Sequence, residues 1–145
     1  MAIIGGASNP VGGSFTGPAE ALEVIGEHAY AESGTQGSST TAFSMLKFTS
    51  GNFYLVGTLA MTGGVQFTSG GIPNGVQNAF QLSYNGSTLK TIKIDSNDEN
   101  SPTNYVIPIL IPPYTEVEVQ GLANQNNSED EISASIQGRI YRTRD

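Results

Sequence analysis

Apolar and polar residues alternate along most of this chain, and this pattern predicts β-strands. Between residues 53 and 61, Phe53, Leu55, Leu59 and Met61 all fall on one face, and residues 80–84 and 132–141 repeat the pattern. A period of two is typical of a strand that buries one face. In residues 19–31 the same rule places Leu22, Val24, His28 and Tyr30 on one face, with Glu23 and Glu27 on the other.

Two further segments carry apolar residues on both faces. Residues 43–48 are one of them, and the run from Tyr105 to Ile111 is the other. A continuous apolar run predicts a strand that is covered on both faces. After the second run, Pro112-Pro113 enforces a turn. Residues 116–119 then alternate strictly between Glu and Val, as in a half-buried strand.

Turn residues divide these segments into eight strands. Asn85-Gly86 is a strong signal for a tight hairpin, and residues 49–52 form a second turn. On the return strand, Leu89 and Ile92 fall on opposite faces, so we expect a bulge between them. The expected strands are residues 19–31, 43–48, 53–61, 80–84, 88–94, 105–111, 116–119 and 132–141.

The connections between these strands alternate between long and short. Residues 32–41, 63–77, 95–103 and 122–131 are long, and the intervening connections are tight turns. This alternation predicts an all-β fold, an eight-stranded antiparallel jelly-roll β-sandwich built from two four-stranded sheets. Pro108 agrees with that topology, because a proline cannot donate to a strand ladder and the sixth strand of a jelly roll lies at a sheet edge.

The first 18 residues have a different composition from the rest. Gly, Ala, Ser and Pro surround a few apolar side chains, and such a segment cannot fold alone. It is either a frayed terminus or an extended arm that lies on a neighbouring subunit. We therefore divide the chain into an N-terminal arm (1–18) and a sandwich domain (19–145). The apolar residues that favour the arm are Ile3, Ile4, Val11 and Phe15.

Composition and charge argue against some classes of partner. The net charge is −7, and three of the six basic residues, Arg139, Arg142 and Arg144, lie at the C-terminal end. Nucleic acid is therefore not an expected partner, because phosphate binding needs a basic patch. The N-terminus has no positively charged, apolar signal peptide, and no apolar run reaches the length of a bilayer span. We expect neither export nor a membrane partner.

The sequence contains no catalytic motif, so we expect no enzymatic activity. His28 lacks a recognisable nucleophile motif beside it, and a packed or rim histidine explains it better. The glycine-rich residues 63–75 lack the Lys-Ser/Thr of a phosphate-binding loop. Tyr30, Tyr54 and Tyr84 could stack on sugar, but strand tyrosines are more often core or subunit-contact residues. With no cysteine, the fold contains no disulfide.

The sequence predicts no resident cofactor, and one alternative to that prediction stays open. Residues 95–100 place carboxylates and amides at the alternating positions that Ca²⁺ favours, but the sharp-turn Gly and the twelfth-position Glu of a calcium loop are missing. A second acidic cluster lies in residues 129–131. A solvated acidic rim explains both clusters more simply than a shared calcium site, whose ligands would be Asp95, Asp98, Glu129 and Asp130.

The strand pattern, the apolar-spotted arm and the segment VIPILIPPYTEVEV (106–119) together resemble small jelly-roll virion proteins. The chain is most similar to the head decoration, or cement, proteins of tailed bacteriophages. That resemblance implies a structural protein on the outer capsid surface of the virion, made in the host cytoplasm. It also implies a homotrimer that binds the major capsid protein lattice. The acidic charge and the absence of Lys and Arg from the arm favour an outward-facing accessory over a shell that encloses a genome.

We expect the contacts with the lattice to come from the arm and from one end of the sandwich. A carbohydrate- or receptor-binding jelly-roll module, as in a tail spike or a lectin, is the alternative function. Its site would lie at the end that carries the long loops, although the lack of tryptophan counts against it. The residues predicted to mediate protein interaction are Ile3, Ile4, Val11, Phe15, Pro112, Pro113 and Tyr114.

Overall fold

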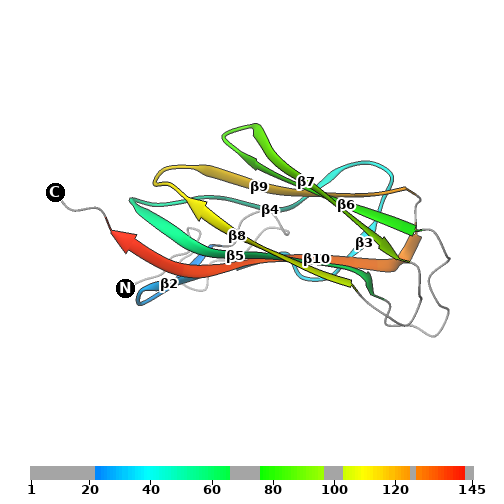
Figure 1. Ribbon diagram of the computed structural model, residues 1–145, viewed down its shortest axis with the longest axis horizontal. Helices are drawn as coiled ribbons and strands as arrows, with labels where there is room; N and C mark the ends of the chain where they lie inside the picture. The colour runs from blue at the N-terminus through cyan, green and yellow to red at the C-terminus, as the bar shows by residue number, and fades with distance from the viewer. Residues whose placement is uncertain (1–21, 66–75, 97–102, 125–126, 143–145) are drawn as a thin grey trace.

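Two antiparallel sheets pack face to face as a β-sandwich (Figure 1). The computed structural model describes residues 22–65, 76–96, 103–124 and 127–142, and all the helix or strand structure in those residues is β. One sheet has six strands and the other has four. The all-β prediction is therefore confirmed.

The six-stranded sheet has the order β1-β2-β10-β5-β8, and β3 also pairs with β10. The four-stranded sheet has the order β4-β9-β6-β7. In chain order the strands are β1 (Glu23–Ile25), β2 (His28–Glu32), β3 (Gln36–Ser38), β4 (Phe43–Thr49), β5 (Phe53–Val65), β6 (Val76–Tyr84), β7 (Ser87–Ser96), β8 (Thr103–Ile111), β9 (Glu116–Ala123) and β10 (Asn127–Arg142).

The core fills the space between the two sheets. It forms because both inner faces carry the alternating apolar positions of their strands, and burial of those side chains is the main favourable term in folding. Among the largest fully buried side chains are Leu55 and Leu59 on β5, Ile136 on β10, Phe80 on β6 and Val117 on β9.

The described residues form ten strands instead of the predicted eight, partly because the part of the expected first strand that lies among them is divided in two. Gly26 adopts a positive φ of 61°, and the chain turns there between β1 and β2. The turn shifts the alternation by one position, so Ala29 and Ala31 face the core. The prediction that His28 and Tyr30 share the apolar face is wrong, because both side chains are exposed.

Bulges explain two irregular patterns. The pairing of β4 with β9 shifts register between Ser44 and Leu46, so the consecutive residues Met45 and Leu46 are both fully buried. The consecutive apolar residues of β4 therefore both pack in the core, and β4 is not a strand covered on two faces as predicted. On β7 the register shifts between Thr88 and Lys90, so the bulge lies at Leu89 itself and not between Leu89 and Ile92 as expected, and this side chain is 55% exposed.

Strand β8 lies at one edge of the six-stranded sheet, which confirms the edge position predicted from Pro108. The apolar run of β8 is not covered on both faces, contrary to the prediction. Ile107, Ile109 and Ile111 face the core, whereas Val106 and Leu110 are exposed. The edge strand thus carries an uncovered apolar face.

The middle of the six-stranded sheet depends on two glycines that pair with each other, Gly57 on β5 and Gly138 on β10. A Cβ atom on Gly57 would overlap the carbonyl oxygen of Gln137, and one on Gly138 would overlap that of Val56. The two backbones therefore approach more closely than any residue with a side chain permits, which is a recognised reason for glycine inside a strand.

We predict that Gly57→Ala destabilises the fold much more than Gly121→Ala does. At Gly57 the new methyl group meets backbone that cannot move without separating β5 from β10, and we expect a loss of at least about 3 kcal/mol. At Gly121 the methyl group meets the ends of two flexible side chains, Met45 Sδ at 2.6 Å and Ile132 Cδ1 at 2.9 Å. There we expect about 1 kcal/mol. Urea unfolding of both variants tests this, and equal losses would contradict it.

Candidate interaction face

The predicted contact residues Pro112, Pro113 and Tyr114 lie in the turn between β8 and β9. Buried Ser50 holds this turn: its Oγ donates to the carbonyl oxygen of Pro112 at 2.7 Å and accepts from the amide of Thr115 at 2.9 Å. These bonds tie the turn to the one between β4 and β5. They satisfy backbone groups that would otherwise be buried without partners.

Tyr114 is the most exposed large side chain of this turn, at 72%. Its φ is +55°, and its amide donates to the carbonyl oxygen of Gly51 at 2.9 Å. Pro112 is also exposed, while Pro113 is half-buried. The turn between β6 and β7 is bonded to this same region, because the side chain of Asn85 accepts a hydrogen bond from the amide of Glu116 at 2.9 Å. The three tight turns thus meet at one end of the sandwich.

The other predicted contact residues, Ile3, Ile4, Val11 and Phe15, lie outside the described residues. The side chains of Asp95, Asp98, Glu129 and Asp130, the proposed calcium ligands, lie outside them too. Within the described part of the chain, no three His, Cys, Asp or Glu side chains come together in a way that could hold a metal ion. In the same part, no helix is long and apolar enough to cross a membrane.

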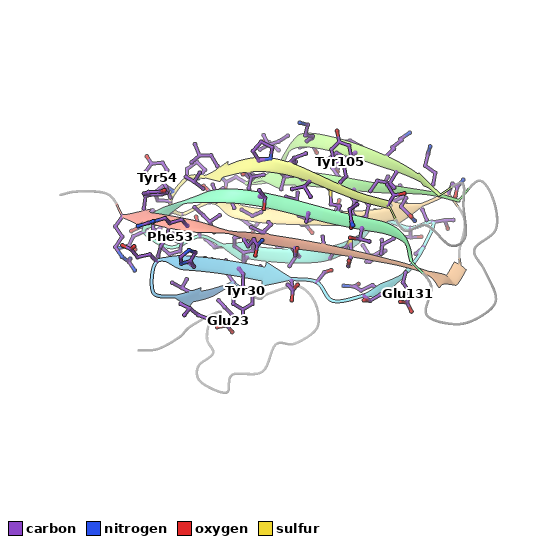
Figure 2. The ribbon with its side chains drawn as sticks, turned by 60° about the horizontal axis from the view of Figure 1, so that its bottom comes forward. Glu23, Tyr30, Phe53, Tyr54, Tyr105 and Glu131 are labelled. Atoms are coloured by element: carbon purple, nitrogen blue, oxygen red, sulfur yellow. The ribbon has the colours of Figure 1, made fainter. Side chains whose placement is uncertain are left out.

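An apolar patch lies on the outer face of the six-stranded sheet at its β8 edge. We call it the apolar edge and define it by Val56 on β5 and Val106, Pro108 and Leu110 on β8. Val56 is 44% exposed, Val106 57% and Leu110 53%. Figure 2 looks onto this sheet and shows β8 beside β5, with Tyr105 and Tyr54 far apart along it.

The pairing of β5 with β8 explains why these side chains gather. Val56 pairs with Leu110, Thr58 with Pro108, and Ala60 with Val106. Paired residues of an antiparallel ladder point to the same side of the sheet and stand about 5 Å apart. The apolar edge is therefore a continuous surface two strands wide, with the Thr58–Pro108 pair at its centre.

Tyr84 fixes the backbone under this surface. Its hydroxyl donates to the carbonyl oxygen of Leu110 at 2.8 Å, so it joins β6 of one sheet to β8 of the other. Burial raises the pKa of Tyr84 to about 12. The sequence analysis treated Tyr84 as a core or subunit-contact residue, and it packs against the core, whereas Tyr30 and Tyr54 are exposed.

Pro108 limits how a partner can approach the apolar edge. Edge strands expose unpaired backbone groups that invite a strand from another chain, and proline removes one donor from that row. Pro108 is the sixth of the nine residues of β8. A partner of the apolar edge therefore has to pack against the side chains instead of extending the sheet across this position.

A hollow of about 430 Å³ lies on the same outer face, across β2, β10 and β5. We call it the sheet hollow. The backbone of Ala29, Gly57 and Gly138 forms its floor, because these paired residues face the core, and the side chains that line it are those of His28, Tyr30, Thr58, Gln137 and Arg139. The alternation in the sequence does not predict this hollow, because the hollow depends on the register of three strands.

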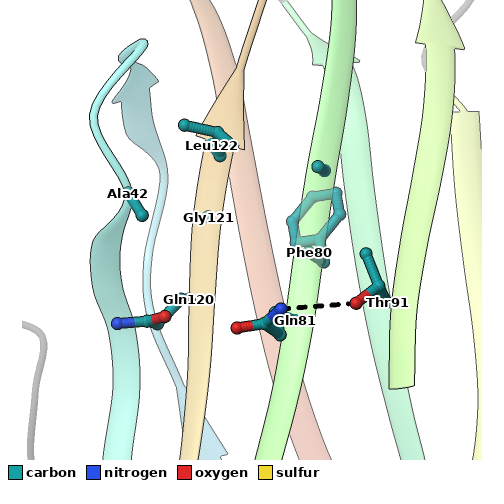
Figure 3. A pocket seen from close by; sticks show the side chains of 8 residues that line it. Ala42, Phe80, Gln81, Thr91, Gln120, Gly121 and Leu122 are labelled. Carbon is teal, nitrogen blue, oxygen red and sulfur yellow. Dashed lines mark hydrogen bonds between the residues drawn. The ribbon is translucent and has the colours of Figure 1, made fainter. Parts of the chain in front are cut away.

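A smaller hollow of about 150 Å³ lies over the four-stranded sheet (Figure 3). Gln81, Thr91 and Gln120 line its polar side, and Gln81 Nε2 donates to Thr91 Oγ1 at 3.4 Å. Ala42 and Leu122 line its apolar side. Its volume is below the range of roughly 300–1,000 Å³ that is usual for small-molecule sites, so the sheet hollow is the better ligand candidate.

Comparison with known proteins gives no family. The chain matches no protein-family model, and no curated protein sequence matches it. Among solved structures it is similar to the crystal structure of dimeric latent PorU from Porphyromonas gingivalis, with 12% sequence identity and a TM-score of 0.38. That match covers 86% of this chain and 14% of the PorU chain. A likeness this distant carries no functional argument.

We predict that Tyr84 makes the fold less stable as the pH rises from 10 to 12. Its pKa in the folded protein is about 12 against an ordinary value of 10.0, so the unfolded chain loses this proton first. Between these pH values the unfolded chain releases the proton more readily than the folded protein does, which favours unfolding. Below pH 10 the contribution of Tyr84 to the free energy of unfolding is fully retained. Urea unfolding at several pH values tests this on the wild type and on Tyr84→Phe.

Other groups titrate in both proteins over this range, so the informative quantity is the difference between the two curves. The wild type should lose its stability advantage over Tyr84→Phe between pH 10 and 12. Parallel curves would show that Tyr84 is not shielded from water, and that its bond to Leu110 does not hold the apolar edge.

Proposed function

We propose that this protein is a structural virion protein, a decoration protein that binds the outer surface of an assembled phage head and stabilises it as a homotrimer. The observation that carries the proposal is the apolar edge. The sequence of β8 is that of a strand covered on both faces, yet among the described residues only one of these faces is covered. Contiguous exposed apolar surface of this kind marks protein interaction sites.

The order of the strands supports a jelly roll within the sandwich. Without the short β1 and β3, each sheet has four strands, in the orders β2-β10-β5-β8 and β4-β9-β6-β7. In chain order these are strands 1-8-3-6 and 2-7-4-5 of eight, which is the arrangement expected of a jelly roll. The small virion proteins that this chain resembles share the jelly-roll fold. In this chain, residues 1–18 would be the extended arm.

Charge supports the outward-facing position. The chain carries a net charge of −7, and Arg139, one of its few cations, is already paired with Glu27 at 2.8 Å. A surface that packs against DNA neutralises phosphates with unpaired Lys and Arg. We therefore assign the partners as the major capsid protein lattice and further copies of this chain, and neither nucleic acid nor membrane.

Stabilisation of the head follows from the linkage between binding and lattice disruption, and it requires no catalysed reaction. A protein that binds the intact lattice, but not its disrupted form, stabilises the lattice by the free energy of that binding. A trimer that meets three matching sites binds far more tightly than one subunit does. We assign the contacts between subunits to the apolar edge. The lattice contacts would come from residues 1–18 and from the end that carries Pro112, Pro113 and Tyr114.

We predict that light scattering finds a trimer and that Leu110→Glu converts it to a monomer. A carboxylate at the centre of an apolar contact has to be desolvated, and that penalty outweighs the few kcal/mol that such a contact contributes. Leu89→Glu is the matched control, because Leu89 is equally exposed but lies on β7 of the other sheet. A wild-type monomer at all concentrations, or loss of the trimer in both variants, would contradict the assignment.

Co-sedimentation with undecorated phage heads tests the function itself. The proposal predicts saturable binding at a copy number compatible with the head symmetry, and decorated heads that resist heat or low salt better than bare ones. Leu110→Glu should bind weakly because it loses avidity, while Leu89→Glu should bind as the wild type does. Trimers that bind no head would refute the decoration role and leave the oligomer intact.

A further inference from the structure

The sheet hollow has the construction of a ligand site, and the decoration role does not use it. Its volume of about 430 Å³ lies within the range of small-molecule sites. Its floor is the backbone of Ala29, Gly138 and Gly57, which pair with one another across three strands and face the core, so the hollow lies between two rows of outward side chains. Side chains from three strands surround this floor (β2, β10 and β5).

Hydrogen-bonding groups of different kinds converge on the hollow. The Gln137 amide offers both donors and an acceptor, the Thr58 hydroxyl can do either, and the His28 imidazole adds ring nitrogens. In the strand register, His28 pairs with Arg139 on β10, and Tyr30 and Thr58 both pair with Gln137. The polar groups therefore stand on adjacent strands, about 5 Å apart in the direction of the ladder.

Arg139 is held in position before any ligand arrives. Its Nη2 donates to Glu27 Oε2 at 2.8 Å, and its guanidinium lies 5.7 Å from the centre of the Tyr141 ring. The backbone of Glu27 is itself fixed, because its carbonyl oxygen accepts from the amide of Ile140 at 2.8 Å. A side chain ordered in advance loses less conformational entropy when it binds a ligand.

The charges around the hollow select a neutral ligand. Arg139 is the one Asp, Glu, Lys or Arg among the described residues that line it, and Glu27 balances its charge. A phosphate or carboxylate ligand would have to compete with Glu27 for the guanidinium, whereas hydroxyl groups can use its remaining N–H donors.

Tyr30 supplies the remaining element of recognition. Its side chain is 42% exposed and lines the hollow from β2 (Figure 2 labels it). An aromatic ring offers a flat apolar surface with a polar hydroxyl at its tip. A pyranose ring has a matching form, with an apolar C–H face and hydroxyl groups around its rim.

We propose that the sheet hollow binds a neutral saccharide, whose ring packs on Tyr30 and whose hydroxyl groups bond to Gln137, Arg139 and Thr58. This site lies on the face of the sandwich and not among the long loops, where the sequence analysis placed a carbohydrate site. The inference does not depend on a capsid, because every residue that it uses belongs to one chain.

Titration of the ¹⁵N-labelled full-length protein with maltohexaose, cellohexaose, mannohexaose and chitohexaose tests the proposal, with hexagalacturonate as the anionic counterpart. We expect saturable binding of at least one neutral hexasaccharide, with amide shifts concentrated at Ala29, Gly57 and Gly138. Hexagalacturonate should bind more weakly. No saturable binding by any neutral probe at millimolar concentration, or tighter binding of the anion, would overturn the proposal.

Variants separate the site from non-specific adsorption. Tyr30→Ala and Gln137→Ala should each weaken binding about tenfold, the usual effect of losing one good contact. Tyr105→Ala should bind like the wild type, because Tyr105 is an exposed tyrosine on β8 that does not line the hollow. Equal affinity of Tyr30→Ala and wild type, or equal weakening by Tyr105→Ala, would overturn the assignment. Exposed positions were chosen so that all three variants fold, which their urea unfolding curves verify.

Discussion

The pairing of β5 with β10 is the interaction on which the rest of the molecule depends. These two long strands pair from Phe53–Arg142 to Val65–Glu131, and they lie at the centre of the six-stranded sheet. Their inner faces supply much of the core, and their outer faces carry the sheet hollow and part of the apolar edge. Gly57 and Gly138 bring the two backbones together in mid-strand.

The alternation in the sequence predicted most of the sandwich, since a period of two identifies a strand without any knowledge of its neighbours. It predicted the edge position of Pro108, because that follows from the missing amide hydrogen of one residue, and a break in the alternation indicated a bulge close to the one found at Leu89. It failed where a single turn or bulge shifts the alternation. The turn at Gly26 exposes His28 and Tyr30, and the bulge in β4 buries both Met45 and Leu46.

The candidate sites were harder to predict, because they depend on pairings between distant segments. The sequence identified Pro112, Pro113 and Tyr114 as a turn, but Ser50, which holds that turn, is remote in the chain. Nor could alternation alone show that Gln137 stands between Tyr30 and Thr58. A surface built by three strands is visible only when their registers are known.

The uncovered face of β8 connects the fold to the proposed function. An edge strand that carries Val106 and Leu110 outward would favour aggregation if it were left open, and Pro108 within it opposes uncontrolled strand addition. The same arrangement suits a specific side-chain contact with further copies of the protein. The opposite sheet offers no equivalent patch among its described residues: Leu89 is its one large apolar side chain with high exposure.

Hydroxyl-radical footprinting of the assembled protein tests the central claim, that the apolar edge is covered in the working state. The account predicts that dilution from the oligomer to the free chain increases oxidation of Val56, Val106 and Leu110. Leu89, on the other sheet, should be oxidised equally in both states. Equal oxidation of the apolar edge before and after dilution, or protection centred on Leu89, would show that the protein meets its partners through another surface.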